Sequence, residues 1–136
     1  MSSAVVRTAF RTELAAAFPA VPIYDTLSLR IDNPSLPALW MSTDFIPTND
    51  VPISIGTPSC RRESGLFRTY IVAKAGAGDA AAIAQADAVI SHFRRWADST
   101  GQIRVAGNTP PTPQDQSDGR WLIVAVDFNF NKSYYV

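Results

Sequence analysis

The sequence is poor in the residues from which most catalytic and metal sites are built. Its 136 residues include a single cysteine, Cys60, and a single histidine, His92. One cysteine cannot form an internal disulfide, so folding does not depend on an oxidising compartment. One cysteine and one histidine also cannot form a thiolate or imidazole cluster, which excludes the usual zinc sites. No metal or other cofactor is therefore expected.

The chain also lacks net charge and long apolar runs. Twelve basic and twelve acidic residues cancel, which leaves no general electrostatic case for binding nucleic acid or a membrane surface. No run reaches the roughly 20 apolar residues that a membrane span needs. Arg7, Arg11 and Glu13 interrupt the first 18 residues, so these lack the apolar core of a signal peptide. We expect a soluble protein made in the cytoplasm.

The chain does contain enough apolar residues for one hydrophobic core. Hydrophobic residues make up 46% of the sequence and charged residues 18%, as is usual for a globular protein. A length of 136 residues corresponds to one domain. No internal repeat or long linker divides the sequence, so we interpret residues 1–136 as a single domain.

Two segments have the periodicity of amphipathic helices. The first covers residues 3–18, with Ser3 as a possible cap and Pro19 ending it. Its apolar stripe consists of Val6, Phe10, Leu14 and Phe18. The second covers residues 79–97, with Asp79 as the N-cap. Its stripe consists of Ile83, Ala86, Val89, Ile90, Phe93, Trp96 and Ala97.

Other segments alternate between apolar and polar residues and predict strands. They cover residues 21–31, 38–46, 64–74, 102–106 and 120–132. Three prolines and a glycine break residues 47–62, so any strand there is short or at a sheet edge. Residues 107–119 are expected to be a polar, proline-rich loop. The order predicts an α+β fold with a mostly antiparallel sheet of about four to five strands and two helices packed on one face.

One short motif imitates a nucleotide-binding fingerprint. Residues 74–81, KAGAGDAA, match G-x-G-x-x-A, but a dinucleotide site needs this loop in the first turn of a parallel βαβ unit. Here the loop lies past the middle of the chain, and Asp79 would place a carboxylate where the pyrophosphate should sit. We interpret Gly76 and Gly78 as a hinge that allows a sharp turn between strand and helix.

Neither His92 nor Cys60 has the neighbours that catalysis requires. His92 lies on a helix flank, where Asp87 and Asp98 stand at spacings that do not present a carboxylate beside the imidazole. The cations that follow Cys60 favour a reactive thiolate, but the chain offers no resolving cysteine and no base. We therefore expect no enzyme, and a domain that acts through its surfaces.

Arginines and tyrosines are the candidate contact residues. Arg61, Arg62 and Arg68 lie near a flexible loop and are interpreted as a contact patch for an acidic partner, with a plain solvated face as the alternative. Tyr134 and Tyr135 follow the last strand. We expect them to be free to dock on another subunit, because aromatic side chains bury a large area at modest entropy cost.

Taken in order, these features make the chain similar to the small tail-terminator, or tail-completion, proteins of long-tailed bacteriophages. A short N-terminal helix ends in FPAVPI, and an irregular middle follows, VPISIGTPSCRRESGLFRTYIVAKAGAG. Then come the alanine-rich helix GDAAAIAQADAVISHFRRW and a long last strand, GRWLIVAVDFNFNK. The resemblance covers nearly all of residues 1–136.

This resemblance implies a structural virion protein that is assembled in the bacterial cytoplasm and lies at the tail–neck junction. Members of the family form a homo-hexameric ring on the last ring of tail tube protein, stop tube growth and offer a surface to the head–neck connector protein. DNA passes through the ring without sequence-specific binding. We expect the contacts on residues 47–66, on residues 107–119 and on the C-terminal tail.

Two other interpretations stay open at this point. The chain could be another head–tail or neck ring component, such as a head-closure or tube-like subunit. It could also be a small ligand-binding or enzymatic α+β domain, which predicts a deep apolar pocket with converging polar groups.

Overall fold

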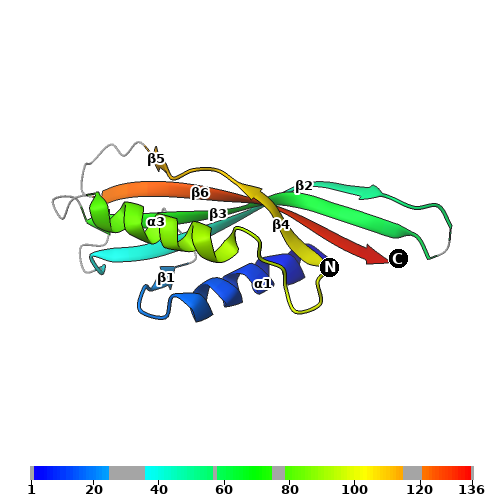
Figure 1. Ribbon diagram of the computed structural model, residues 1–136, viewed down its shortest axis with the longest axis horizontal. Coiled ribbons are helices and arrows are strands. Elements are labelled where there is room, and N and C mark those ends of the chain that lie inside the picture. Colours follow the sequence, from blue (N-terminus) through cyan, green and yellow to red (C-terminus); the bar gives the residue numbers. More distant parts are fainter. Residues whose placement is uncertain (1, 25–35, 57, 75–78, 115–120, 136) are drawn as a thin grey trace.

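The computed structural model describes residues 2–24, 36–56, 58–74, 79–114 and 121–135. Within these ranges the chain forms two helices and six strands (Figure 1). In chain order they are α1 (Ser2–Ala17), β1 (Ile23–Tyr24), β2 (Leu39–Pro52), β3 (Cys60–Lys74), α3 (Ala80–Phe93), β4 (Ile103–Asn108), β5 (Thr112–Gln114) and β6 (Trp121–Tyr135).

The strands form one sheet in the order β1-β2-β3-β6-β4, and β5 also pairs with β6. Among the strands of the described residues, only β1 and β2 run parallel; the other pairs are antiparallel. β3 and β6 pair along their whole length, from Cys60 opposite Tyr135 to Lys74 opposite Trp121. The predicted α+β class with a mostly antiparallel sheet is confirmed, and the sheet has six strands.

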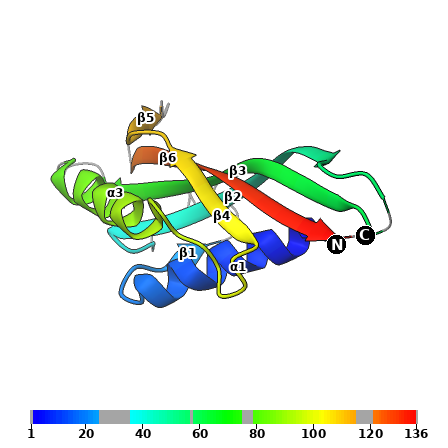
Figure 2. The ribbon, with the colours of Figure 1, turned by 45° about the vertical axis from the view of Figure 1, so that its right-hand side comes forward.

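Both helices pack on one face of the sheet, which we call the helix side (Figures 1 and 2). The predicted stripe of α1 is confirmed, since Val6, Phe10 and Leu14 have no exposed surface. Strand alternation supplies the other half of the core. Its buried strand residues are Met41, Phe67, Ile71, Ala73, Ile103, Val124, Val126, Phe128 and Phe130.

Phe10 lies at the centre of this core. Its ring stacks on that of Phe67 at 4.6 Å between centroids and on that of Phe93 at 5.7 Å. The rings of Trp96 and Phe130 lie 4.9 and 5.9 Å away. One α1 side chain therefore contacts both the sheet and the segment around the end of α3, on the face that the two helices share.

The opposite face, which we call the far side, carries a second and smaller core. Trp40, Val72 and Ile123 follow one another across β2, β3 and β6 and are buried there. The rings of Trp40 and Trp121 meet edge to face at 6.0 Å. The sheet is thus buried on both sides at the end where these tryptophans lie.

The second helix starts where predicted, with Asp79 at the N-cap position, but it is shorter than predicted. It ends at Phe93 rather than at residue 97, and Asp79 makes no capping hydrogen bond through its side chain. The helix ends there because the residues that follow it pair with β4 instead. Val105 N donates to Trp96 O, and Ala97 forms a β-bridge with Arg104. Trp96 still packs against the core, as predicted.

Ile83 was placed on the buried stripe of this helix, and that prediction is wrong. Its side chain is 37% exposed, whereas Ala82 and Ala86 are buried in its place. The small side chains of Ala82 and Ala86 allow α3 to lie close to the sheet. The buried stripe therefore begins at Ala82, one residue before the position that hydrophobicity alone selects. Ile83 consequently lies at the solvent boundary.

Two predictions about strand boundaries also need correction. β2 continues through Pro47 to Pro52, with a register shift between Pro47 and Asn49. This part of β2 lies at a sheet edge, as predicted for a strand within residues 47–62, because β1 pairs with β2 only at Met41 and Ser42 among the described residues. The predicted loop at 107–119 contains the end of β4 and the short strand β5. The expected strand beyond residue 24 and the glycine hinge lie outside the described residues.

Candidate functional site

Three strand ends extend past the start of α1 as an arm (Figures 1 and 2). The arm consists of residues 47–56, residues 58–64 and residues 131–135. Near its tip, Ile53 N donates to Cys60 O at 2.9 Å. Because β6 continues to Tyr135, Tyr134 and Tyr135 lie within the third strand of the arm. The prediction of a free tyrosine tail is wrong for Tyr134, whose hydroxyl is hydrogen-bonded to Asp50.

The arm carries apolar side chains that no other described part of the chain covers. Seven large apolar side chains are exposed in the described chain, and four of them belong to the arm: Val51, Ile53, Ile55 and Tyr135. Ile55 is fully exposed at the tip, and Tyr135 is 71% exposed. Clustered exposed apolar residues mark interaction sites more often than single ones do.

A hydrogen-bonded cluster joins the three strands on the helix side of the arm. The Tyr134 hydroxyl donates to Asp50 Oδ2 at 2.5 Å, and Arg61 Nε donates to Asp50 Oδ1 at 3.2 Å. The hydrogen bond from Tyr134, followed by Arg61, lowers the pKa of the Asp50 carboxyl, since both stabilise the ionised form. The same bond to Asp50 raises the pKa of Tyr134. One carboxylate thus links β2, β3 and β6.

Arg68 does not join this cluster. It lies six residues along β3 from Arg62, on the far side of the sheet, opposite Asp127 of β6 and Asp44 of β2. Its guanidinium donates to both Asp127 carboxylate oxygens, at 2.6 and 3.0 Å. This paired contact, followed by Tyr70, raises the pKa of Arg68. Arg68 therefore joins β3 to β6 in the body of the sheet.

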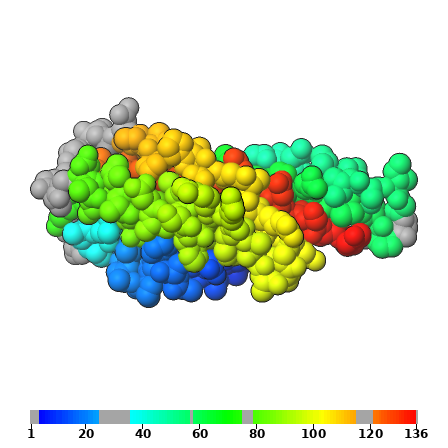
Figure 3. Space-filling model, viewed as in Figure 1, coloured from blue at the N-terminus to red at the C-terminus, as the bar shows by residue number. Residues whose placement is uncertain are grey.

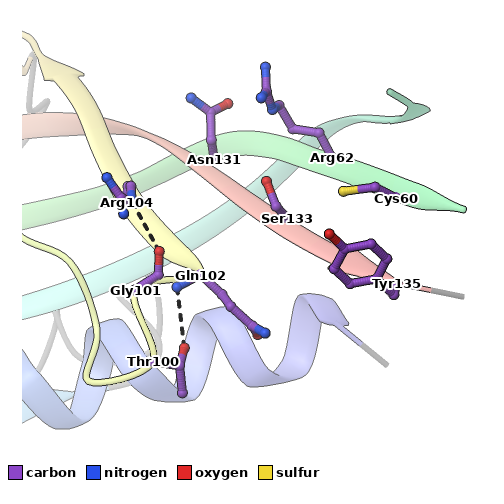
Figure 4. A pocket seen from close by; sticks show the side chains of 9 residues that line it. All are labelled: Cys60, Arg62, Thr100, Gly101, Gln102, Arg104, Asn131, Ser133 and Tyr135. Carbon is purple, nitrogen blue, oxygen red and sulfur yellow. Dashed lines mark hydrogen bonds between the residues drawn. The ribbon is translucent and has the colours of Figure 1, made fainter. Parts of the chain in front are cut away.

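Beside the arm lies an open groove of about 550 Å³, between the end of β6 and the turn that leads into β4 (Figure 4). Its lining includes two arginines, Arg62 and Arg104, together with Asn131, Ser133 and Tyr135. Arg104 Nε donates to Gly101 O at 2.9 Å, which holds this side chain at the groove. No carboxylate is among the described residues that line the groove. Its chemistry suits an acidic group from another molecule.

The single histidine, His92, joins the two helices. His92 Nε2 lies 2.8 Å from Glu13 Oε1, joining α3 to α1, and its ring meets that of Phe18 edge to face. Cys60 is a free, half-buried thiol at the groove. Over the described ranges, no three His, Cys, Asp or Glu side chains are arranged to hold a metal ion. No helix in this part of the chain is long and apolar enough to cross a membrane.

The structure brings together only some of the predicted contact residues. Arg61 and Tyr134 meet on the helix side of the arm, Arg62 and Tyr135 line the groove on its far side, and Arg68 is separate. Sequence reasoning missed two partners, Asp50 and Arg104. No local signal identifies them, because Asp50 meets Tyr134 only when β3 pairs with both β2 and β6, and Arg104 reaches the groove only when β4 pairs with β6.

Comparisons with known proteins agree with this fold. A family model described as phage tail terminator protein matches residues 5–130. No curated protein matches the sequence at a significant level. A solved structure of a protein that carries no functional name superposes with a TM-score of 0.64 over 100% of this chain and 99% of its own, at 19% identity. At that identity the likeness concerns the fold alone.

Proposed function

The chain belongs to the phage tail terminator family, and we propose that it forms a ring that caps the tail tube, ends tube polymerisation and joins the tail to the head–neck connector. Its family is structural and non-enzymatic, and its place is the tail of the virion. The observation that carries the proposal is the family match, which spans residues 5–130. The alternative of a ligand-binding domain would need an enclosed apolar pocket.

The arm supports a role in assembly. A closed ring uses head-to-tail contacts, so each subunit needs two different, complementary surfaces. An arm that extends past the helical layer and exposes Val51, Ile53 and Ile55 suits one of them. We place neighbour or tube contacts on Arg61, Arg62, Tyr134 and Tyr135 of the arm and assign Arg68 to the adjoining sheet face.

The balanced charge of the chain suits a ring through which DNA must move. Twelve basic and twelve acidic residues give zero net charge. A strongly basic lumen would hold DNA through its phosphates, since each neutralised phosphate adds to the affinity. We propose that DNA passes through the central hole without sequence-specific binding.

Light scattering over a concentration series, with and without the matching tail tube protein, tests this function. We expect a discrete hexamer, alone or induced by the tube. A monomer that ignores the tube would refute the proposal, and open-ended polymers would indicate a tube-like subunit instead. Assembly into tails that still bind a connector would test the joint.

A pair of matched variants locates the contact. Ile53→Lys combined with Ile55→Lys places two charges on the arm, and we expect loss of tube capping with an unchanged melting temperature, because both side chains are exposed. Val5→Lys is the control, since Val5 is 52% exposed on α1 and does not belong to the arm. Equal assembly by both variants would remove the arm from the proposal.

A further inference from the structure

Two arginines at the groove lack an acidic partner within the described chain. Arg61 and Arg68 form ion pairs, but neither Arg62 nor Arg104 forms one with any described carboxylate. Both line the groove beside the arm, next to the exposed ring of Tyr135 (Figure 4). This surface thus offers two cations and an apolar ring to another molecule.

A matching surface lies on the outward face of α3. Asp87 is exposed there, and no described side chain pairs with it. Ile83 precedes it by one helical turn and is 37% exposed. Ala84 and Ala88 are exposed beside these two residues, and such small side chains let another backbone approach closely. Asp79, also exposed, stands just before the first turn.

The two surfaces lie toward opposite ends of the molecule. α3 starts at the end of the molecule away from the arm (Figure 1) and forms part of the outer surface in the space-filling view (Figure 3). One copy therefore cannot bring its own groove onto its own α3. Two copies arranged head to tail can, and repetition of that contact closes a ring if the rotation fits.

We infer that the arm of one copy docks on the outward face of α3 of a second copy, with Asp87 entering the groove between Arg62 and Arg104. Val51 and Tyr135 then cover Ile83 and its neighbouring alanines. Both charge and apolar character are complementary, which orients the contact and disfavours other pairings. This inference rests on the proposed ring and names its subunit interface.

Charge reversal tests the contact. Arg62→Glu and Asp87→Arg each place like charges together, so we expect the concentration for half-assembly to rise about tenfold or more. The combined Arg62→Glu and Asp87→Arg protein regains opposite charges, and its assembly should return toward that of the unmodified chain. Lys74→Glu is the control, because Lys74 is exposed at the other end of β3 from the arm.

The outcomes separate this inference from the proposed function. If the unmodified chain forms no ring, even with tube protein, both fail. If it forms a ring that Arg62→Glu leaves intact, or that the double reversal does not restore, the inference is overturned and the ring stands. The inference is also overturned if Arg62→Glu leaves ring assembly intact and weakens only the binding of double-stranded DNA, since the groove would then bind phosphates of DNA. Matching circular dichroism melts exclude misfolding as the cause.

Discussion

Gly65 lies in β3 where the arm begins, and the strands on either side of it leave no room for a side chain. A Cβ atom at this position would lie 2.5 Å from the Ile46 carbonyl oxygen, 2.9 Å from Pro47 Cα and 2.9 Å from Phe130 Cε1. Two of these three atoms belong to the backbone of β2, next to its register shift, so they cannot move aside as a flexible side chain could.

We therefore expect Gly65→Ala to lower the free energy of unfolding. Real Cβ atoms do not approach backbone atoms this closely, so β2 or the Phe130 ring must shift. Phe130 stacks on Phe45 at 5.3 Å, and displacing its ring disturbs the core. Overpacking of this kind costs about 1–3 kcal/mol. For a domain of this size each kcal/mol corresponds to roughly 3–6 °C in melting temperature.

Gly107→Ala is the matched control for this prediction. Gly107 also lies in a strand, but a Cβ there meets only Asn129 Nδ2, at 3.9 Å, which is an ordinary contact. Replacing this glycine should leave stability unchanged or raise it by about 0.5 kcal/mol through the unfolded chain. Urea unfolding of both variants measures the difference. Equal stability of the Gly65→Ala protein and the unmodified chain would refute the close packing at the base of the arm.

Three further outcomes are expected. Phe10→Ala should reduce the free energy of urea unfolding by about 3–5 kcal/mol, because the ring is fully buried among four others; a loss below 1 kcal/mol would contradict its central place. Arg68→Lys should lower the free energy of unfolding by about 1 kcal/mol in the same assay, since an ammonium lacks the planar fork that donates two parallel hydrogen bonds to Asp127; no change would show that this ion pair does not stabilise the fold. Tyr134→Phe should lower the melting temperature at pH 6–7. This difference should shrink as pH falls below about 4. The hydrogen bond from Tyr134 lowers the pKa of Asp50 in the folded chain, so it stabilises the fold only while that carboxyl is ionised. A difference that does not depend on pH would contradict this hydrogen bond.

Local periodicity predicted which face of a single helix or strand is buried. The stripe of α1 and the alternation of β6 are read from neighbouring residues, and both are confirmed by burial of Phe10 and Phe128. Sequence reasoning failed where a distant strand competes with local preference. Trp96 and Ala97 continue a helical pattern, yet hydrogen bonds to β4 pull them out of the helix.

The candidate site was less predictable than the fold. Its arginines and tyrosines could be named, because their residue types suit interfaces. Their division into a helix side and a far side could not, since it follows from the pairing of Arg61 with Tyr134 and of Arg62 with Ser133. A register changed by one residue would exchange the two sets.

The amino-acid sequence by itself determined the class of fold, the faces of α1 and β6, and the similarity to the tail terminator family, because these depend on the order and spacing of residues. Only the tertiary structure decided that β2 continues past Pro47 as far as Pro52, that Asp50 joins three strands, and that Arg62 and Arg104 share a groove. Those features arise where strands far apart in the chain pair, and the free energy of that pairing outweighs the local preference of any one segment.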